Sequence, residues 1–397
     1  MSRLEELIQQ YCPDGVEYRP LGEVCKPLPK GTLTTKDLIE QNEQSYPVIN
    51  SGRGLYGYYH QFNNEGDAFT VAARGEYAGY ITYFSDKFWA GGLCYPYRSN
   101  TTKICTKFIF YYLKARQEYI RHTLVAEGSI PALNKGTLDL LEIPVPPLPV
   151  QEEIVRILDN FAELQAELQA ELQKRLQQYE YYRDKLLSFS DLSNWGGQEV
   201  SVEWKKLGDV ADLLSGFPFD STQFTSAGIR LMRGVNIKRG QLCFNENDDR
   251  YWKSTAGLEK YVVEENDIVI SMDGSLVGKS FGMVKKEHLP LLLVQRVARI
   301  RSSVFNINFI YHCIKNWFPN YVDKKKTKGA IPHISMKDIA NFPLPSLSLK
   351  EQEKIATILD RFDTLTNDLS QGLPAEIEAR RKQYEYYRDT LLTFKKK

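Results

Sequence analysis

The chain of 397 residues has few of the residues that build metal centres and disulfide frameworks. Its five histidines are isolated and its six cysteines form no C-x-x-C pair, so the spacings typical of zinc sites are missing. We therefore expect reduced thiols in a cytoplasmic protein. No stretch approaches the roughly 18 apolar residues that a membrane helix requires. The charged opening MSRLEELIQQYCPDG also lacks the apolar core of an export signal, so neither export nor a membrane partner is expected.

The chain also lacks a strong excess of either charge. Lys and Arg number 51 against 50 Asp and Glu, which gives a formal net charge of +1 at pH 7. Residues 191–347 hold 21 basic and 17 acidic residues, whereas residues 151–190 hold 5 and 8. Composition alone therefore gives little support for binding a polyanion. Any such surface must concentrate its charge on one face, or share the work with a partner.

Catalytic motifs are missing as well. An adenine methyltransferase needs an N-P-P-Y or D-P-P-Y run to hold a flipped base, and the chain has neither. The segment GSLVGKS at 274–280 has one residue too few between its glycines for a phosphate loop, so we expect a structural turn. Glu264, Glu265, Asp267 and Lys279 loosely resemble a nuclease metal cluster, but their spacing favours a solvated strand edge. We assign no catalytic or metal-binding residue.

The chain does contain a series of motifs that occurs twice in the same order. QYEYYRDKLLSF at 178–189 returns as QYEYYRDTLLTF at 383–394, and PVQEEIVRILDNF at 149–161 returns within LKEQEKIATILDRF at 349–362. Four further matches precede these in the same order, at shifts that drift between 186 and 201 residues. A period near 200 residues is too long for a solenoid, so the sequence predicts two copies of a domain with its trailing helix.

Each copy predicts the same series of elements. Short buried strands that end in glycine turns come first, followed by an aromatic helix at 108–120 or 309–318 and a proline-punctuated connector. Residues 151–189 contain no Gly or Pro, and apolar residues recur there every three, four or seven positions. This pattern is typical of an amphipathic helix with coiled-coil character, roughly 60 Å long. In the second copy the pattern breaks at Gly372, and we expect Pro374 to open a fresh helix.

The expected fold class is α+β, with two similar mixed α/β recognition domains separated by an antiparallel pair of long coiled-coil helices and related by a pseudo-two-fold repeat. The expected division is a first recognition domain at 1–148, a central long helix at 149–190, a second recognition domain at 191–347 and a C-terminal helical spacer at 348–397. A plain interpretation of this layout is a spacer or scaffold. A sharper one is a ruler that holds two domains over two tracts of DNA, with an unread gap between the tracts.

Several motifs of the chain form a recognisable set: IPVPPLPVQEEIVRILDNF, FPLPSLSLKEQEKIATILDRF, the paired YEYYRD-x-LL runs and the turns VAARGEYAG and VISMDGSLVG. Through these motifs, nearly the whole chain resembles the specificity subunit of type I restriction–modification systems. The resemblance implies a non-catalytic chain that binds a bipartite site in double-stranded DNA through two target-recognition domains. It also implies docking of two adenine-N6 methyltransferase (modification) subunits, and leaves open whether two restriction subunits join. No cofactor is implied for this chain, since S-adenosylmethionine, Mg and ATP would belong to partner subunits. VQEE in the first copy departs from the family's E-Q pattern.

Basic residues in turns and loops are the candidates for DNA contact, because Arg and Lys pair with phosphates and with guanine edges. These candidates are Arg53, Arg74, Arg233, Lys238, Lys324, Lys325, Lys326 and Lys328. For the lysines, which we place on a loop, the alternative is a solvated loop; for the arginines it is a structural salt bridge. Asn236 and Gln241 are weaker candidates for reading adenine. We expect Lys395, Lys396 and Lys397 to form a solvated tail.

Three tyrosines within four residues of each long helix exceed what a coiled-coil seam needs. Packing between helices accounts for some of them, and the family resemblance adds a docking surface for methyltransferase subunits. The expected docking residues are Tyr179, Tyr181, Arg183, Tyr384, Tyr386 and Arg388. Two other functions stay open at this point: a coiled-coil scaffold whose two globular domains bind proteins rather than DNA, and an enzyme with an unrecognised site.

Overall fold

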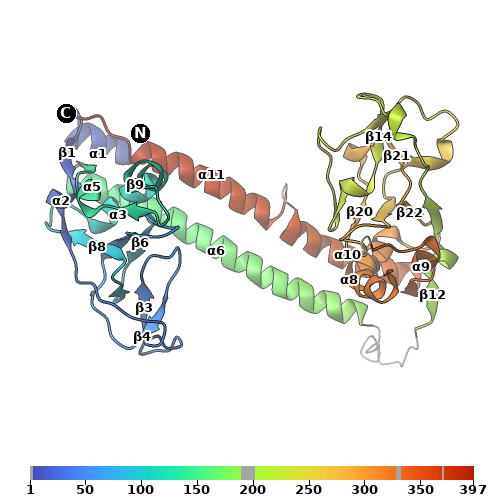
Figure 1. The fold of residues 1–397 in the computed structure, drawn as a ribbon, viewed down its shortest axis with the longest axis horizontal. Coiled ribbons are helices and arrows are strands. Elements are labelled where there is room, and N and C mark those ends of the chain that lie inside the picture. The colour runs from blue at the N-terminus through green and yellow to red at the C-terminus, as the bar shows by residue number, and fades with distance from the viewer. Residues whose placement is uncertain (1–2, 189–201, 328–331, 369–370) are drawn as a thin grey trace. The chain divides into compact units, whose positions relative to one another are not determined.

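The computed structural model describes residues 3–188, 202–327, 332–368 and 371–397 (Figure 1). Contacts divide the chain into two compact units. Unit 1 consists of Met1–Ala170 with Ala375–Lys397, and unit 2 consists of Glu171–Pro374. Each unit therefore joins one mixed α/β domain to part of the central helix and to one C-terminal helix.

Two of the four small sheets in the described part of unit 1 have more than two strands. The larger sheet is antiparallel with strand order β2-β8-β5-β6, and the smaller has the order β4-β3-β7, in which β3 and β7 run parallel. The strands of unit 1 are β1 (Glu17–Pro20), β2 (Cys25–Pro27), β3 (Tyr46–Ile49), β4 (Gly57–Tyr59), β5 (Ala68–Ala72), β6 (Ile81–Phe84), β7 (Trp89–Ala90), β8 (Cys94–Ser99), β9 (Val125–Ala126), β10 (Ala132–Leu133) and β11 (Glu142–Val145). All five residues of β5 are buried, as expected for an apolar run that ends at a glycine turn.

The helices of unit 1 cover the larger sheet and lead into the long helix. They are α1 (Arg3–Tyr11), α2 (Leu21–Val24), α3 (Thr106–Ala115), α4 (Gln117–Tyr119), the π-helical turn η1 (Ile120–Leu124), α5 (Lys135–Asp139) and α6 (Leu148–Leu187). The single aromatic helix expected at 108–120 is thus divided. It stops at Ala115 because Arg116 leaves the helical region, at φ −100° and ψ 10°.

Unit 2 repeats this topology. The order β13-β22-β19-β20 matches β2-β8-β5-β6, and a parallel β14–β21 pair matches β3–β7. Its strands are β12 (Trp204–Lys206), β13 (Asp212–Ser215), β14 (Ile229–Met232), β15 (Ile237–Lys238), β16 (Gln241–Leu242), β17 (Tyr251–Trp252), β18 (Val262–Val263), β19 (Ile268–Ser271), β20 (Phe281–Met283), β21 (Leu291–Leu293), β22 (Val297–Arg301) and β23 (Pro343–Pro345). The predicted duplication of an α+β domain is confirmed.

In the described part of unit 2, four short 3-10 turns accompany the α-helices. The helical elements are α7 (Leu207–Val210), η3 (Ser221–Gln223), η4 (Gly234–Asn236), η5 (Glu259–Tyr261), η6 (Lys286–His288), α8 (Ile307–Lys325), α9 (Met336–Ala340), α10 (Leu349–Asn367) and α11 (Leu373–Leu391). Helix α11 continues into unit 1. Pro374 lies in its first turn, as predicted.

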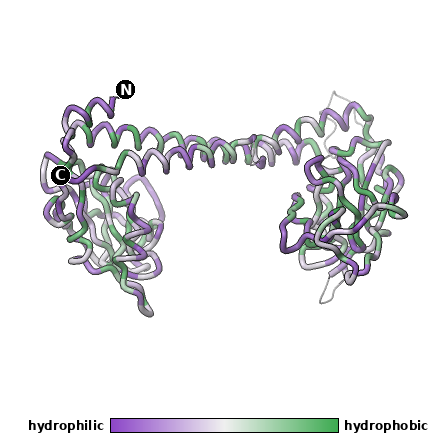
Figure 2. The backbone as a smooth tube through the Cα atoms, turned by 90° about the horizontal axis from the view of Figure 1, so that it is seen from above, coloured by the Kyte–Doolittle hydropathy of each residue, from purple (hydrophilic) through white to green (hydrophobic). Residues whose placement is uncertain are grey.

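The long helix buries its apolar stripe on two different partners. Helix α6 is continuous over 40 residues, and hydrophobic positions alternate with hydrophilic ones along it (Figure 2). In unit 1 its Phe161 ring stacks on Tyr387 of α11, with centroids 5.5 Å apart. In unit 2 its Tyr182 ring stacks on Phe362 of α10, at 5.8 Å. The first half of α6 thus meets the last helix, and the second half meets the preceding one, which is the order that antiparallel pairing requires.

A buried glutamine joins each mixed α/β domain to the start of the helix that follows it. Gln151 is fully buried, and its Oε1 accepts a hydrogen bond from the Cys105 backbone N–H at 2.8 Å, while its Nε2 donates to the Pro146 carbonyl at 2.6 Å. In unit 2, Gln352 makes the equivalent bonds with the backbone of Asn306 and Leu347, at 2.9 and 2.8 Å. The departure from the E-Q pattern falls on Val150, so the glutamine itself is kept in both copies.

The C-terminal residues do not form the solvated tail that we expected. Val16 donates its backbone N–H to the Lys395 carbonyl at 2.8 Å, and Lys397 donates to the Val16 carbonyl at 3.1 Å. The Lys396 ammonium also lies 2.7 Å from a carboxylate oxygen of Glu142. These backbone bonds fix the tail to unit 1, and the lysine-rich composition of the segment hid them.

All six cysteines are free thiols in the structure. Burial raises the pKa of the Cys25 and Cys94 thiols to about 12, so both stay protonated at neutral pH.

We predict that Gln151→Leu lowers the free energy of unfolding of unit 1 by about 2–4 kcal/mol, because a buried N–H and a buried carbonyl lose their partners. Urea unfolding followed by circular dichroism measures this change. Gln169→Leu, on an exposed position of the same helix, is the matched control and should shift stability by no more than about 0.5 kcal/mol. Equal unfolding midpoints for the two variants would contradict the role given to Gln151.

Candidate nucleic-acid interface

A cationic groove lies in unit 1 between α3, strand β6 and the first part of α6. Its lining includes Arg53, Tyr80, Lys107, Lys114 and Asp159. The Lys107 ammonium lies 2.7 Å from Asp159 Oδ2, and the Tyr111 hydroxyl donates to the other oxygen of the same carboxylate at 2.5 Å. The charge of Lys107 is therefore neutralised inside the groove.

Lys114 stands two helical turns after Lys107 and has a different environment. Its ammonium donates to the Ile81 carbonyl at 2.9 Å and to Gln117 Oε1 at 2.8 Å, and lies 4.0 Å from the centre of the Tyr80 ring. Burial lowers the pKa of Lys114 from its ordinary value. Arg53, exposed on its loop, is the further cation of the groove.

A second groove, in unit 2, brings together two of the predicted DNA contacts. Arg233 and Lys238 line it with Asp273, Gln295 and Arg296. Gln295 and Arg296 form the exposed turn between β21 and β22, and Arg296 adopts a φ of 70° that side chains rarely accept. Two backbone bonds hold this turn: Gln295 donates to the Phe217 carbonyl at 2.8 Å, and Met272 donates to the Arg296 carbonyl at 2.9 Å.

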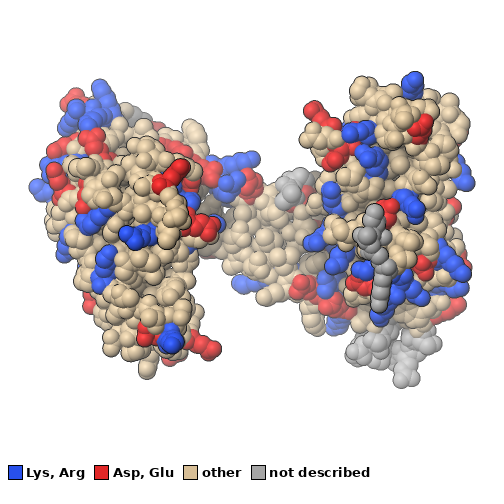
Figure 3. All heavy atoms as spheres, viewed as in Figure 1, with Lys and Arg blue, Asp and Glu red and all other residues tan. Residues whose placement is uncertain are grey.

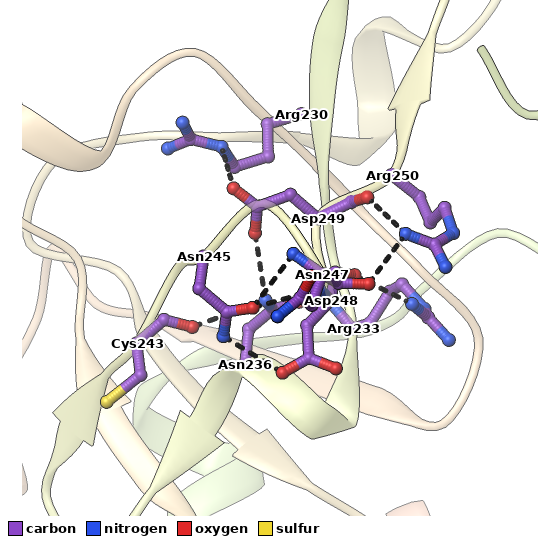
Figure 4. Close-up of polar contacts among 9 residues, drawn as sticks. All are labelled: Arg230, Arg233, Asn236, Cys243, Asn245, Asn247, Asp248, Asp249 and Arg250. Atoms are coloured by element: carbon purple, nitrogen blue, oxygen red, sulfur yellow. Dashed lines mark hydrogen bonds and ion pairs between the residues drawn. The ribbon is translucent and has the colours of Figure 1, made fainter. Parts of the chain in front are cut away.

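A polar network positions Arg233 at the edge of this groove (Figure 4). Asn236 is fully buried; its side-chain oxygen accepts from the Arg233 N–H at 3.1 Å, and its amide nitrogen donates to the Cys243 carbonyl and to Asp249. The Arg233 guanidinium donates to the Asp248 carbonyl at 3.0 Å. Asn236 therefore cannot read adenine as we expected, because its amide is committed to holding the 243–250 loop. Gln241 is exposed on the β15–β16 hairpin and stays a candidate.

The other predicted DNA contacts are distributed over the two units. Arg74 is exposed beside the isolated bridge that its backbone makes with Ala132. Lys324 and Lys325 lie in the last turn of α8 rather than on a loop, where they complement the helix dipole. The Lys326 ammonium lies 2.6 Å from Asp323, and Lys328 is outside the described residues.

The resemblance to a nuclease cluster has a structural origin. Asp267 is 1% exposed and takes two hydrogen bonds of 2.7 Å from the Arg301 guanidinium, which also contacts Glu264. Asp267 is thus a buried ion-pair partner, and our expectation of a solvated strand edge is wrong for it. The segment 274–280 forms a turn in which Gly274 and Gly278 have positive φ, as predicted.

Neither a metal-binding cluster of His, Cys, Asp and Glu nor a helix long and apolar enough to cross a membrane occurs in the described part of the chain. Lys and Arg lie among Asp and Glu over the face of each unit drawn in Figure 3, consistent with the near-zero net charge. The cationic grooves are therefore local features of two mixed surfaces.

The family model described as "Type I restriction modification DNA specificity domain" matches the chain twice, at residues 13–178 and 199–379. The chain belongs to this family.

Curated relatives support the same assignment, and a solved structure shares the fold. The chain is 30% identical to the EcoR124I/EcoR124II specificity subunit of Escherichia coli over 100% of its own length and 98% of that subunit. It is 29% identical to the Escherichia coli EcoAI specificity subunit over 64% of this chain and 43% of that one. The crystal structure of a type I restriction–modification S subunit from M. genitalium aligns with a TM-score of 0.69 at 18% identity, covering 96% of this chain and 97% of that one.

In this member of the specificity family, the tyrosine runs face two ways. Tyr179 is 5% exposed and lies 6.0 Å from the Phe362 ring, and Tyr384 lies 6.3 Å from Phe161, so both serve packing. Tyr181 and Tyr386 are 61% and 68% exposed. Arg183 and Arg388 pair with the aspartate that follows each of them. We expected Tyr179 and Tyr384 to dock partners, but both pack between helices, because they lie on the apolar stripes that the helices bury against one another. Docking at the outward-facing tyrosines and at the two arginines stays a prediction.

Some groove residues were missed at the level of sequence. Lys107 and Lys114 recur at a spacing of seven on a predicted helix, which places them on one face two turns apart, and this spacing was the available signal. The β21–β22 turn that presents Gln295 and Arg296 gave no comparable signal, because it contains no Gly, Asn or Asp at its left-handed position.

Proposed function

We propose that this chain is the DNA specificity subunit of a type I restriction–modification complex, a non-catalytic chain that reads a bipartite site. Residues 1–148 would read one half-site and residues 191–347 the other. The observation that carries this proposal is the double match of one DNA-specificity family model, each copy spanning one mixed domain and much of the helical segment that follows it. The proposal includes a cytoplasmic location, where such a duplex would be met.

The proposed DNA contacts are exposed cations in the two grooves and elsewhere on the two units. Arg53 and Arg74 are exposed in unit 1, and Lys238 is exposed beside Arg233 in unit 2. Arg forks suit guanine edges and phosphates, whereas Lys acts as a point charge toward phosphate. Phosphate contacts from the lysine-rich segment 324–328 would supply affinity without sequence preference. This last set consists of Lys324, Lys325, Lys326 and Lys328.

Partner docking belongs on the long helices. We propose that two adenine-N6 methyltransferase subunits bind there, one near Tyr181 and Arg183 and the other near Tyr386 and Arg388. The exposed tyrosines support this proposal, because large aromatic side chains in solvent are typical anchors of protein interfaces. Restriction subunits would join the same assembly where the system has them. S-adenosylmethionine, Mg and ATP would be bound by these partners.

Selection from random duplexes tests the proposed function. The chain, assembled with its cognate methyltransferase, should enrich two short defined tracts around an undefined gap of constant length. Exchange of residues 1–148 for the corresponding domain of a relative should change one tract and leave the other. Absence of enrichment would favour a coiled-coil scaffold whose domains bind proteins.

The length of α6 should set the gap. Residues 162–173 read AELQ three times. Removal of residues 166–169 deletes one copy, shortening the helix by about 6 Å while turning its apolar stripe by only about 40°. We predict a gap shorter by roughly one to two base pairs with both tracts unchanged, measured by the same selection. Altered tracts with an unchanged gap would show that the helix does not set the spacing.

We predict that the double variant Tyr181→Ala and Tyr386→Ala weakens assembly with the methyltransferase subunits roughly tenfold or more, since each change removes a large aromatic contact. Sedimentation of the mixed subunits measures the affinity and the number bound. Tyr119→Ala, at a tyrosine that is 52% exposed but lies off the long helices, serves as the control and should assemble normally. If the double variant assembles as well as the wild type, the methyltransferase subunits dock on a different surface.

A further inference from the structure

One lysine occupies the same place in both units but has an acidic partner in only one. Lys114 of α3 corresponds to Lys315 of α8 at the repeat shift of 201 residues. In unit 2 the Lys315 ammonium donates to both oxygens of Asp363, at 2.6 and 2.7 Å. The residue that corresponds to Asp363 in unit 1 is Ala162, which lines the groove together with Lys114.

The charge of Lys114 is therefore not cancelled by the groove. Its oxygen partners, the Ile81 carbonyl and the Gln117 side chain, are both neutral. Among the residues that the structure describes, no carboxylate oxygen lies within 4.0 Å of its ammonium, whereas the neighbouring Lys107 is paired with Asp159. Glu163 is the remaining acid that lines the groove, and it is exposed on α6.

Arg53 adds a second positive charge at the same point. Burial acts to raise the pKa of the Tyr80 hydroxyl, but the charges of Lys114 and Arg53 outweigh this effect, and the pKa is lowered from its ordinary value. Both cations thus act on one phenol, although they come from a loop and a helix that are 61 residues apart in sequence. The result is a hydroxyl donor flanked by two cations at an open groove.

We propose that Arg53, Lys114 and the Tyr80 hydroxyl bind a phosphate group, and that this phosphate belongs to the DNA backbone beside the half-site of unit 1. A guanidinium fork, an ammonium and a phenol offer complementary donors to phosphate oxygens. Unit 2 lacks this site because Asp363 already occupies the ammonium of Lys315. The DNA part of the inference rests on the proposed function, whereas the phosphate chemistry does not.

The change Ala162→Asp tests this proposal by supplying unit 1 with the carboxylate that unit 2 has. Position 162 is exposed, and Ala162→Asn provides a neutral control of the same size. In the full complex on its selected duplex, Ala162→Asp should weaken binding roughly tenfold at low salt. It should also reduce the slope of log affinity against log salt by about 0.9, the value of one phosphate contact. Equal melting temperatures of the two variants establish that folding is intact.

A methylphosphonate scan of the duplex identifies the phosphate. Neutralising one phosphate beside the first half-site should weaken DNA binding by the wild type but not by Ala162→Asp. The variant Lys315→Gln, which changes the corresponding lysine of unit 2, should respond to this neutralisation as the wild type does. Identical salt slopes for the Asp and Asn variants, together with a scan unaffected by Ala162→Asp, would overturn the DNA assignment.

Calorimetric titration of the DNA-free chain with inorganic phosphate separates the two sources of the ligand. Phosphate binding that Ala162→Asp abolishes, with an unchanged duplex scan, would support the site but assign it to a free anion. If the wild-type complex shows no sequence preference for DNA, only the proposed function is refuted. The phosphate titration still decides whether the groove binds phosphate. If Ala162→Asp weakens neither phosphate binding nor duplex binding, the proposal is wrong.

Discussion

The attachment of each recognition domain to its helix depends on one buried side-chain amide. Gln151 and Gln352 each accept from the backbone before the aromatic helix and donate to the connector that precedes the long helix. An amide can do both at once because it carries an acceptor and a donor on one rigid plane. The connector, the aromatic helix and the long helix of each unit are thereby fixed to one another. In unit 1 this junction positions Lys107, Lys114 and Asp159, which line the groove from the aromatic helix and the long helix.

The apolar stripe of α6 is the second constraint, and it explains why the chain is duplicated rather than merely extended. An amphipathic helix of 40 residues must cover its stripe along its whole length. One copy of the unit supplies only part of that cover. Phe161 and Phe362 occupy equivalent positions in the two copies, and each stacks on tyrosines of the opposite helical segment. The repeat thus provides two equivalent packing contacts from one pattern.

Sequence reasoning predicted the repeat and the fold class, because these depend on periodicity that a single chain displays. It failed where partners come from distant segments. The sequence around Asn236 does not indicate that its amide will donate to Asp249, and the sequence around Asp267 does not indicate that it will pair with Arg301. The tail residue Lys395 likewise meets Val16 only after unit 1 has closed. Groove composition depends on such distant contacts, so the sequence offered Arg53 from its loop and the spacing of Lys107 and Lys114, but not the position of Lys114 beside Tyr80.

Unit 1 is assembled from the two ends of the sequence, since residues 375–397 complete a body begun by residues 1–170. A ribosome makes those pieces first and last, with all of unit 2 between them. Unit 2 can therefore finish folding during synthesis, while the earlier-made half of unit 1 waits with the surface of α6 around Phe161 uncovered. A chain that ends just after Pro374 would keep an intact unit 2 and an unfinished unit 1, exposing apolar surface of the kind that chaperones and proteases detect.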